Sequence, residues 1–251
     1  MEGFSSHMWD WYTGSIIWKT QNPWTSLRGQ MYDYYLDPNA CLYGLRKGSE
    51  PLHIMLNPID SMVSVVNNGF STHNSLMIQA KAYDMDGKEY FYSQVFNSIG
   101  PSSVRKFFPL TDFLTKLDKK EGVFVSLKLM NEQQQVLSEN IYWMADKDGT
   151  YKGLQNIKQT QPTITALKKD KHKVAVTLNN ANGNPLAFFN RIALINKQTG
   201  ERILPAFYDD NYVSVLPGES RTITVECPGD EDNLAVEVYG WNVAKQRIEV
   251  R

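Results

Sequence analysis

The sequence predicts a mainly β protein, with two immunoglobulin-like β-sandwiches preceded by a short α/β remnant of a (β/α)8 barrel. Three observations predict this fold class. Short segments of alternating apolar and polar residues, separated by turn residues, fill most of positions 52–145 and 162–250. The stretch between these two sets is polar and rich in turn residues. The first 48 residues differ from both sets, because their apolar residues suggest short helices around one strand.

The N-terminal part, 1–48, is expected to be the C-terminal edge of a barrel. Apolar residues at helical spacing predict a helix over 2–12, another over 27–35 and a helical turn over 41–45. Between the first two, residues 15–18 predict a short buried strand that runs into a polar loop flanked by tryptophans. A strand, a loop and a helix form the unit of a (β/α)8 barrel, but a closed barrel needs about 250 residues.

The two sandwiches are expected at 49–147 and 162–251, joined by a linker at 148–161. About seven short strands over about 100 residues are typical of an immunoglobulin-like sandwich. Asp112 can cap one helical turn within the first set. The strands of the first sandwich are expected near 52–57, 60–67, 75–85, 88–97, 103–108, 122–130 and 135–145. Those of the second are expected near 162–168, 172–179, 185–196, 201–206, 212–215, 219–227, 233–241 and 246–250.

Composition and charge exclude several classes of partner. Hydrophobic residues make up 42% of the chain and charged residues 21%, which is ordinary for a soluble globular protein. The formal net charge is -1 and no basic patch stands out, so we expect no nucleic-acid partner. No apolar run approaches the ~20 residues of a membrane-spanning helix, so we expect no membrane partner. The first residues also lack the charged start and apolar core of a signal peptide.

The most specific motifs lie in the first 57 residues, and three more follow later. The early motifs are Trp9, Tyr12-Thr-Gly14, Ile17-Trp-Lys-Thr-Gln-Asn-Pro-Trp-Thr25, Leu27-Arg-Gly-Gln30, Tyr32-Asp33, Leu36-Asp37, Tyr43-Gly44, Glu50-Pro-Leu-His53 and Leu56-Asn57. The later motifs are Asn140-Ile-Tyr-Trp143, Pro205-Ala-Phe-Tyr-Asp-Asp-Asn-Tyr212 and Leu216-Pro-Gly-Glu219. Together they resemble the C-terminal part of glycoside hydrolase family 2, in the group of mannosylglycoprotein endo-β-mannosidases and exo-β-D-glucosaminidases.

The resemblance implies a non-catalytic C-terminal fragment of a larger enzyme, which would be secreted or periplasmic and would act on β-mannosidic or β-glucosaminidic bonds. Retaining glycosidases use two carboxyl groups about 5 Å apart. In the family both are glutamates, on the fourth and seventh barrel strands, and both positions would precede Met1. Glu2 would lie on the helix after the seventh strand. We therefore assign no catalytic residue, no metal ligand and no cofactor to this chain.

The resemblance also implies five substrate-binding residues in the parent enzyme: Trp18, Lys19, Gln21, Asn22 and Trp24. In the family, a tryptophan at position 18 forms an apolar floor under the sugar at the cleavage point. Barrel enzymes place substrate contacts at the C-terminal ends of their strands, which suits this position. Simple barrel packing for both tryptophans, and a solvated surface role for Lys19, stay open as alternatives.

Three further features favour structural interpretations. Asp84-Met-Asp-Gly87 begins like a calcium loop but lacks the remaining ligands, so we expect a hairpin turn. The aromatic and acidic stretch 207–212 is either a rim that reaches toward a glycan or a corner of the sandwich, and we favour the corner. The histidines pair with no Ser or Cys motif and are expected at the surface or at strand edges: His7, His53, His73 and His172.

A free-standing carbohydrate-binding or adhesion module is the alternative function. Aromatic residues make up 12% of the chain, and amphipathic rings can stack on sugars. A third possibility is a structural protein that docks onto a separate chain bearing the rest of the barrel. In each case the apolar residues of 1–47 should be buried against another surface, because large exposed apolar patches are unusual. We expect this segment to dock on the first sandwich or to mediate self-association.

Overall fold

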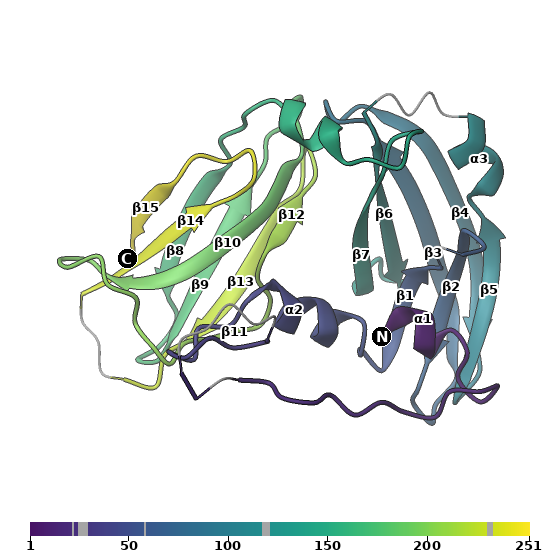
Figure 1. Cartoon of the computed structure of the whole chain (residues 1–251), viewed down its shortest axis with the longest axis horizontal. Coiled ribbons are helices and arrows are strands. Elements are labelled where there is room, and N and C mark those ends of the chain that lie inside the picture. Colours follow the sequence, from purple (N-terminus) through teal and green to yellow (C-terminus); the bar gives the residue numbers. More distant parts are fainter. Residues whose placement is uncertain (22, 25–29, 58, 117–120, 230–232) are drawn as a thin grey trace. The chain divides into compact units, whose positions relative to one another are not determined.

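The computed structural model describes residues 1–251 except 22, 25–29, 58, 117–120 and 230–232. The described residues form four antiparallel sheets and few helices, which confirms the mainly β class (Figure 1). Contacts divide the chain into two compact units. Unit 1 comprises Met1–Ile16 and Gly44–Asn156, and unit 2 comprises Ile17–Tyr43 and Ile157–Arg251. The N-terminal segment is therefore shared between the units.

Unit 1 is a β-sandwich of two sheets, drawn in blue and teal in Figure 1. Buried side chains from both sheets, such as Ile54, Val65, Ile78 and Leu127, form its core. One sheet has the order β1-β2-β5, with β1 (Leu52–Leu56), β2 (Met62–Asn67) and β5 (Ser103–Pro109). The other has the order β4-β3-β6-β7, with β3 (His73–Tyr83), β4 (Glu89–Ile99), β6 (Val123–Met130) and β7 (Val136–Met144).

These strands match the seven that the sequence predicts for the first sandwich, to within a few residues. The turn between β3 and β4 is the expected hairpin. The Asp84 Oδ1 atom accepts hydrogen bonds from the backbone N–H groups of Asp86 and Lys88, both at 2.9 Å, and Gly87 takes the positive φ of 84° that the turn requires. The expected helical turn after β5 is α3 (Thr111–Lys116).

Unit 2 is a second sandwich, drawn in green and yellow. Its core combines both sheets, with Val176, Ile192, Ile223 and Val236 among the buried residues. One sheet has the order β12-β10-β14-β15, with β10 (Ala187–Asn196), β12 (Val213–Val215), β14 (Leu234–Tyr239) and β15 (Gln246–Glu249). The other has the order β11-β13-β9-β8, with β8 (Thr163–Lys168), β9 (Lys173–Asn179), β11 (Phe207–Tyr208) and β13 (Ser220–Glu226).

One predicted strand of unit 2 is wrong. Residues 201–206 form only an isolated bridge, between Arg202 and Ile195, because Pro205 has no N–H group to donate to a ladder. The stretch that follows is the expected sandwich corner. The Asn211 side chain bonds both the N–H and the C=O of Ile192, and the Tyr208 hydroxyl accepts the Leu194 N–H at 2.8 Å.

Most of the secondary structure predicted for the N-terminal segment is also wrong. Helix α1 spans only Glu2–Ser5, and residues 15–18 form no strand. Of the helix predicted over 27–35, residues 30–35 are not helical, and residues 27–29 lie outside the described residues. A strand needs partners for its backbone groups, and no described residues pair with 15–18. Helix α2 (Ala40–Lys47) confirms the turn expected over 41–45. The structure thus does not show a barrel remnant.

The stretch expected as a linker contains a short 3-10 helix, η1 (Lys152–Asn156), whose residues Gly153 and Leu154 are buried. A Cβ atom added at Gly153 would lie 1.9 Å from the carbonyl oxygen of Glu121, so only glycine fits there. Within the described parts of the chain, the helices are too short or too polar to cross a bilayer.

Candidate functional site

The residues predicted to bind substrate lie on an extended stretch between α1 and α2. Trp18 is 85% exposed and Trp24 is 65% exposed. Within the described residues, neither ring makes a hydrogen bond or a ring contact. Lys19 has a positive φ of 67° and is exposed. Asn22 lies outside the described residues. Among the described residues, therefore, no closed site forms around Trp18 or Trp24.

Gln21 is the exception, because it meets the loop that precedes α2. It forms an isolated parallel bridge with Tyr32, and its Nε2 atom lies 3.5 Å from the Asp33 carbonyl oxygen. The Asp33 carboxylate in turn accepts the backbone N–H groups of Tyr35 and Asp37, at 2.8 and 3.0 Å. An aspartate that binds nearby backbone N–H groups orders a turn, which explains why the predicted helix does not form here.

The end of this loop is fixed to unit 2 by charge and by burial. Asp37, whose side chain is 14% exposed, pairs with both Arg191 and Arg202. Arg191 also donates to the Tyr239 hydroxyl at 2.8 Å. Tyr43 follows on α2, is 5% exposed and belongs to the apolar core of unit 2. Burial raises the pKa of Tyr43 far above its usual value, so the phenol stays neutral.

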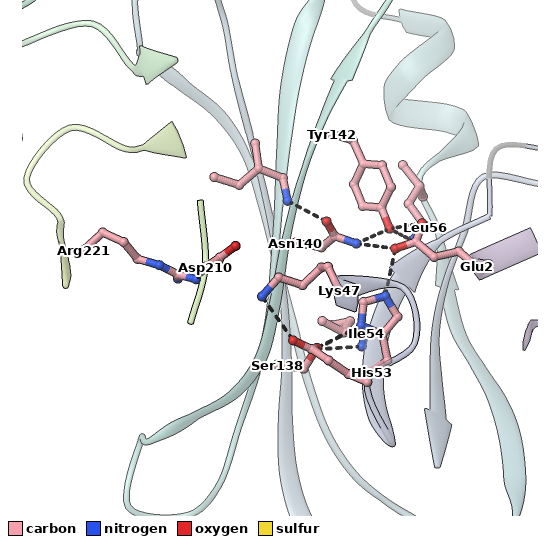
Figure 2. A network of polar contacts seen from close by, with 12 residues as sticks. Glu2, Lys47, His53, Ile54, Leu56, Ser138, Asn140, Tyr142, Asp210 and Arg221 are labelled. Carbon is pink, nitrogen blue, oxygen red and sulfur yellow. Dashed lines mark hydrogen bonds and ion pairs between the residues drawn. The ribbon is translucent and has the colours of Figure 1, made fainter. Parts of the chain in front are cut away.

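Helix α1 is fixed to unit 1 by a buried polar network, shown in Figure 2. His53 on β1 is 1% exposed. Its Nε2 atom lies 2.8 Å from Glu2 Oε1 and its Nδ1 atom 3.0 Å from Glu50 Oε2. The Tyr142 hydroxyl donates to Glu2 Oε2 at 2.9 Å, and the Ser138 hydroxyl donates to Glu50 Oε2 at 2.7 Å. Both carboxylates are therefore held by several donors.

The local fold places these donors together. Ser138, Asn140 and Tyr142 alternate along β7, and alternate residues of a strand point to the same side. The Asn140 amide donates to Glu2 as well. The same side chains also satisfy β1, because the Leu56 N–H donates to the Tyr142 hydroxyl at 3.0 Å and the Ile54 N–H to the Ser138 hydroxyl at 3.2 Å.

The electrostatics of the network favour a protonated imidazole. Burial acts to lower the pKa of His53, but hydrogen bonds with Glu2 and Glu50 outweigh it and raise that pKa above its ordinary value. Burial likewise acts to raise the pKa of Glu50, but hydrogen bonds with His53 and Ser138 and the charge of Lys47 lower it. The Lys47 ammonium lies 3.1 Å from Glu50 Oε1. The network thus favours the protonated form of a buried histidine that lies between two carboxylates.

This polar network attaches helix α1 to strands β1 and β7. His53 lies on the edge strand β1, which one of the predicted alternatives allows, but it is buried rather than exposed, because two carboxylates compensate its burial. The available sequence signals were Glu50 three residues before His53 and the alternating polar residues of β7. Nothing in the sequence placed Glu2 beside His53, because 51 residues separate them.

Comparison with protein families matches residues 140–243 to the Exo-beta-D-glucosaminidase Ig-fold domain. Among curated proteins, a mannosylglycoprotein endo-beta-mannosidase of Lilium longiflorum is 29% identical, and the match covers 100% of this chain and 33% of that protein. An exo-beta-D-glucosaminidase of Amycolatopsis orientalis is 28% identical, with 94% of this chain and 25% of that protein covered. The chain thus spans about a third or less of the length of these relatives.

Solved structures of glycosidases also match most of this chain. The exo-chitosanase CsxA of Amycolatopsis orientalis matches with a TM-score of 0.85 and 26% identity, over 99% of this chain and 32% of that chain. A beta-D-mannosidase from Dictyoglomus thermophilum has a TM-score of 0.70 at 19% identity, which supports the fold alone. Over its whole length, the chain therefore resembles the C-terminal part of family 2 glycoside hydrolases of the endo-β-mannosidase and exo-β-D-glucosaminidase type.

Proposed function

We propose that this chain is the non-catalytic C-terminal portion of a retaining family 2 glycoside hydrolase that cleaves β-mannosidic or β-glucosaminidic bonds. In this proposal, residues 1–48 complete the edge of the catalytic barrel. The sandwiches at 49–147 and 162–251, joined through 148–161, support the barrel and help to shape the glycan cleft. The two catalytic carboxyl groups belong to the part of the parent enzyme that this chain does not contain.

The observation that carries the proposal is the exposure of the segment between α1 and α2. Ile16, Trp18 and Trp24 are 96%, 85% and 65% exposed, although such side chains normally avoid water. The relatives match this segment as part of enzymes about three times as long. A missing barrel accounts for both facts, because it would cover the apolar side chains that the sandwiches leave open.

Within the parent enzyme, we propose that Trp18 forms an apolar floor under the sugar at the cleavage point. Trp24 flanks the same loop, and Gln21 and Asn22 offer amide groups to substrate hydroxyls. Lys19 offers a cation at the rim. The bond between Gln21 and the Asp33 carbonyl, together with the Asp37 pairs, would hold this loop against unit 2.

A chimera tests the proposal. This chain replaces the matching portion of the Amycolatopsis orientalis exo-β-D-glucosaminidase, and release of p-nitrophenol from p-nitrophenyl β-D-glucosaminide is measured. We expect activity in the chimera and none in the isolated chain or in the enzyme truncated before this portion. Trp18→Ala should lower kcat/KM about 10- to 100-fold, because a buried aromatic contact contributes about 1.5–3 kcal/mol.

The matched control is Phe70→Ala, which removes an aromatic side chain that is 94% exposed in unit 1. It should leave kcat/KM unchanged. A chimera as inactive as the truncated enzyme would contradict the supporting role, and hydrolysis by the isolated chain would contradict its non-catalytic nature.

In the absence of a barrel, we propose that the exposed apolar residues of 1–47 mediate self-association of the chain. Light scattering should then report a mass above that of one chain, and Trp18→Ala combined with Ile16→Ala should lower it. A monomer at all concentrations would contradict this part of the proposal.

A further inference from the structure

A concave surface lies on unit 1, away from the residues considered so far. It is a cleft of about 910 Å³ on the outer face of the β4-β3-β6-β7 sheet. At its end, β3 carries a bulge between His73 and Leu76, where Ser75 adopts a positive φ of 51°. Bulges re-aim side chains and recur beside binding sites. The hairpin between β6 and β7 contributes another wall.

The floor of this cleft is partly apolar. Phe96 on β4 is 67% exposed, and within the described residues its ring makes no aromatic contact. Met77 pairs with Phe96 in the register of β3 and β4, so the two side chains lie next to each other on the outer face. An exposed ring beside a methionine offers a flat apolar surface to a ligand.

The remaining lining consists mostly of side-chain amides. Gln79 and Gln94 are cross-strand neighbours on the same face as Phe96, and Asn74 and Gln134 stand at the end of the cleft. Within the described residues, the amides of Asn74, Gln79 and Gln134 make no hydrogen bond. The Gln94 amide oxygen accepts the Tyr92 hydroxyl, so Gln94 would meet a ligand through its NH2 group. Each amide has two donors and an acceptor oxygen, which suits a ligand that carries many hydroxyl groups.

The charges of the lining residues restrict the class of ligand further. Among the described residues that line the cleft, Glu132 alone ionises at neutral pH. A phosphate, a nucleic acid or an acidic peptide would need cations in the wall, which this cleft does not supply. An aromatic floor with neutral hydrogen-bonding walls is the chemistry that binds uncharged sugars, whose rings have apolar faces and hydroxyl edges.

We propose that this cleft is a binding site for an uncharged oligosaccharide, with Phe96 as the stacking ring and Gln79 and Gln94 as hydroxyl partners. Beyond the cleft, Tyr92 and Tyr90 share the outer face of β4 and are each 51% exposed, with the ammonium groups of Lys81 and Lys88 lying 5.7 and 5.1 Å from their ring centroids. From Phe96 to Tyr92 the strand rises roughly 13 Å, which suits an extended chain of sugars rather than one ring. The site goes beyond the proposed function, since it needs no barrel.

The test is titration calorimetry of the whole chain with β-1,4-mannohexaose and with β-1,4-N-acetylchitohexaose. We expect at least one of these uncharged hexasaccharides to bind, and Phe96→Ala to weaken its binding about tenfold, equivalent to about 1.4 kcal/mol. Gln79→Ala combined with Gln94→Ala should weaken it by a similar factor. Circular dichroism establishes that these exposed substitutions preserve the fold.

A control variant separates this site from other exposed aromatic surface. Phe70→Ala, which removes an exposed aromatic side chain outside the cleft, should leave the affinity unchanged. Absence of binding by both hexasaccharides would overturn the inference, and so would binding that Phe96→Ala leaves intact. Neither result bears on the chimera, whose activity tests the proposed function separately.

Discussion

The two units hold their shares of the N-terminal segment in different ways. Unit 1 holds α1 through a buried histidine, His53, whose two ring nitrogens meet the carboxylates of Glu2 and Glu50. Unit 2 holds the end of the segment through Asp37, which pairs with arginines, and through Tyr43 in its apolar core. One attachment contains a titratable cation, and the other contains cations that stay charged at every accessible pH.

The difference shows that the two attachments of one continuous segment can respond differently to pH. Removal of apolar area costs free energy at every pH, whereas a buried imidazolium contributes only while it carries its proton. The attachment to unit 2 should therefore withstand a change of pH better than the attachment to unit 1. Four predictions test this contrast, from the largest effect to the smallest.

Tyr43→Ala should cause the largest loss. Tyr43 is 5% exposed in the core of unit 2, and truncation of a buried aromatic side chain typically costs about 3–5 kcal/mol. Peptide-resolved hydrogen exchange should show that the free energy of opening in β9 and β13 falls by a similar amount. The control Tyr43→Phe removes only the hydroxyl and should cost about 1 kcal/mol. Equal protection in the wild type and Tyr43→Ala would mean that α2 does not anchor the segment.

His53→Ala should destabilise unit 1 by about 2–3 kcal/mol. It leaves Glu2 and Glu50 without their shared cation, and the cost is below that of a fully buried pair because both carboxylates are partly exposed. Hydrogen exchange should rise in β1 and in residues 2–16 and stay unchanged in unit 2. A loss of protection spread evenly over both units would contradict two separate attachments.

The stabilisation by His53 should depend on pH. The folded pKa of His53 is raised, so its contribution is complete below its unfolded value of 6.5 and disappears as pH rises through the folded pKa. The folded pKa of Glu50 is lowered, so its contribution is complete above 4.5 and disappears as pH falls through the folded pKa. Tyr142 stays neutral throughout, because burial and the charge of Glu2 raise its pKa.

The measurement compares exchange in β1 between the wild type and His53→Gln at matched pH. Matched pH cancels the intrinsic exchange rates and the titration of unrelated groups. The advantage of the wild type should be largest near about pH 6 and should shrink by about pH 9. The corresponding comparison of Tyr43→Phe in unit 2 should show no such trend. A constant advantage across this range would show that His53 acts without its proton.

Two tryptophans of the same segment should have the smallest effects. The Trp9 indole N–H donates to the Ser102 carbonyl and hydroxyl oxygens, at 3.0 and 2.9 Å, so Trp9→Ala should cost about 1 kcal/mol in unit 1. Trp18 makes no such bond within the described residues, so Trp18→Ala should change stability by less than about 0.5 kcal/mol. Thermal unfolding of the two variants gives the comparison. A larger effect of Trp18→Ala would reveal a contact formed in solution.

Sequence patterns predicted the sandwiches far better than the N-terminal segment. Alternation along β3 and β13 reflects packing within each sandwich, so those strands could be recognised from local sequence alone. Residues 15–18 are as apolar as a strand, but a strand also needs neighbours, and sequence periodicity contains no information about their presence. Their exposure follows from the lack of a partner within the described chain rather than from their composition.

Some candidate site residues could also be recognised from the sequence, whereas other sites became visible only in the folded structure. Trp18 and Trp24 were identified through a resemblance, and their roles stay predictions. The network at His53 was missed because its members come from α1, β1 and β7 and meet only after folding. The cleft at Phe96 was missed for a related reason, because its amides are adjacent only through the pairing of β3 with β4.

The tight fit of Gly153 against Glu121 affects where the protein can be cut. A shortened version that ends at residue 147 would discard Gly153 and Leu154, although both are buried within unit 1. Such a fragment would lose the close contact of Gly153 with the Glu121 backbone, and the resulting loss of stability could be mistaken for an intrinsic weakness of the sandwich. A fragment that ends after Asn156 retains Gly153 and Leu154.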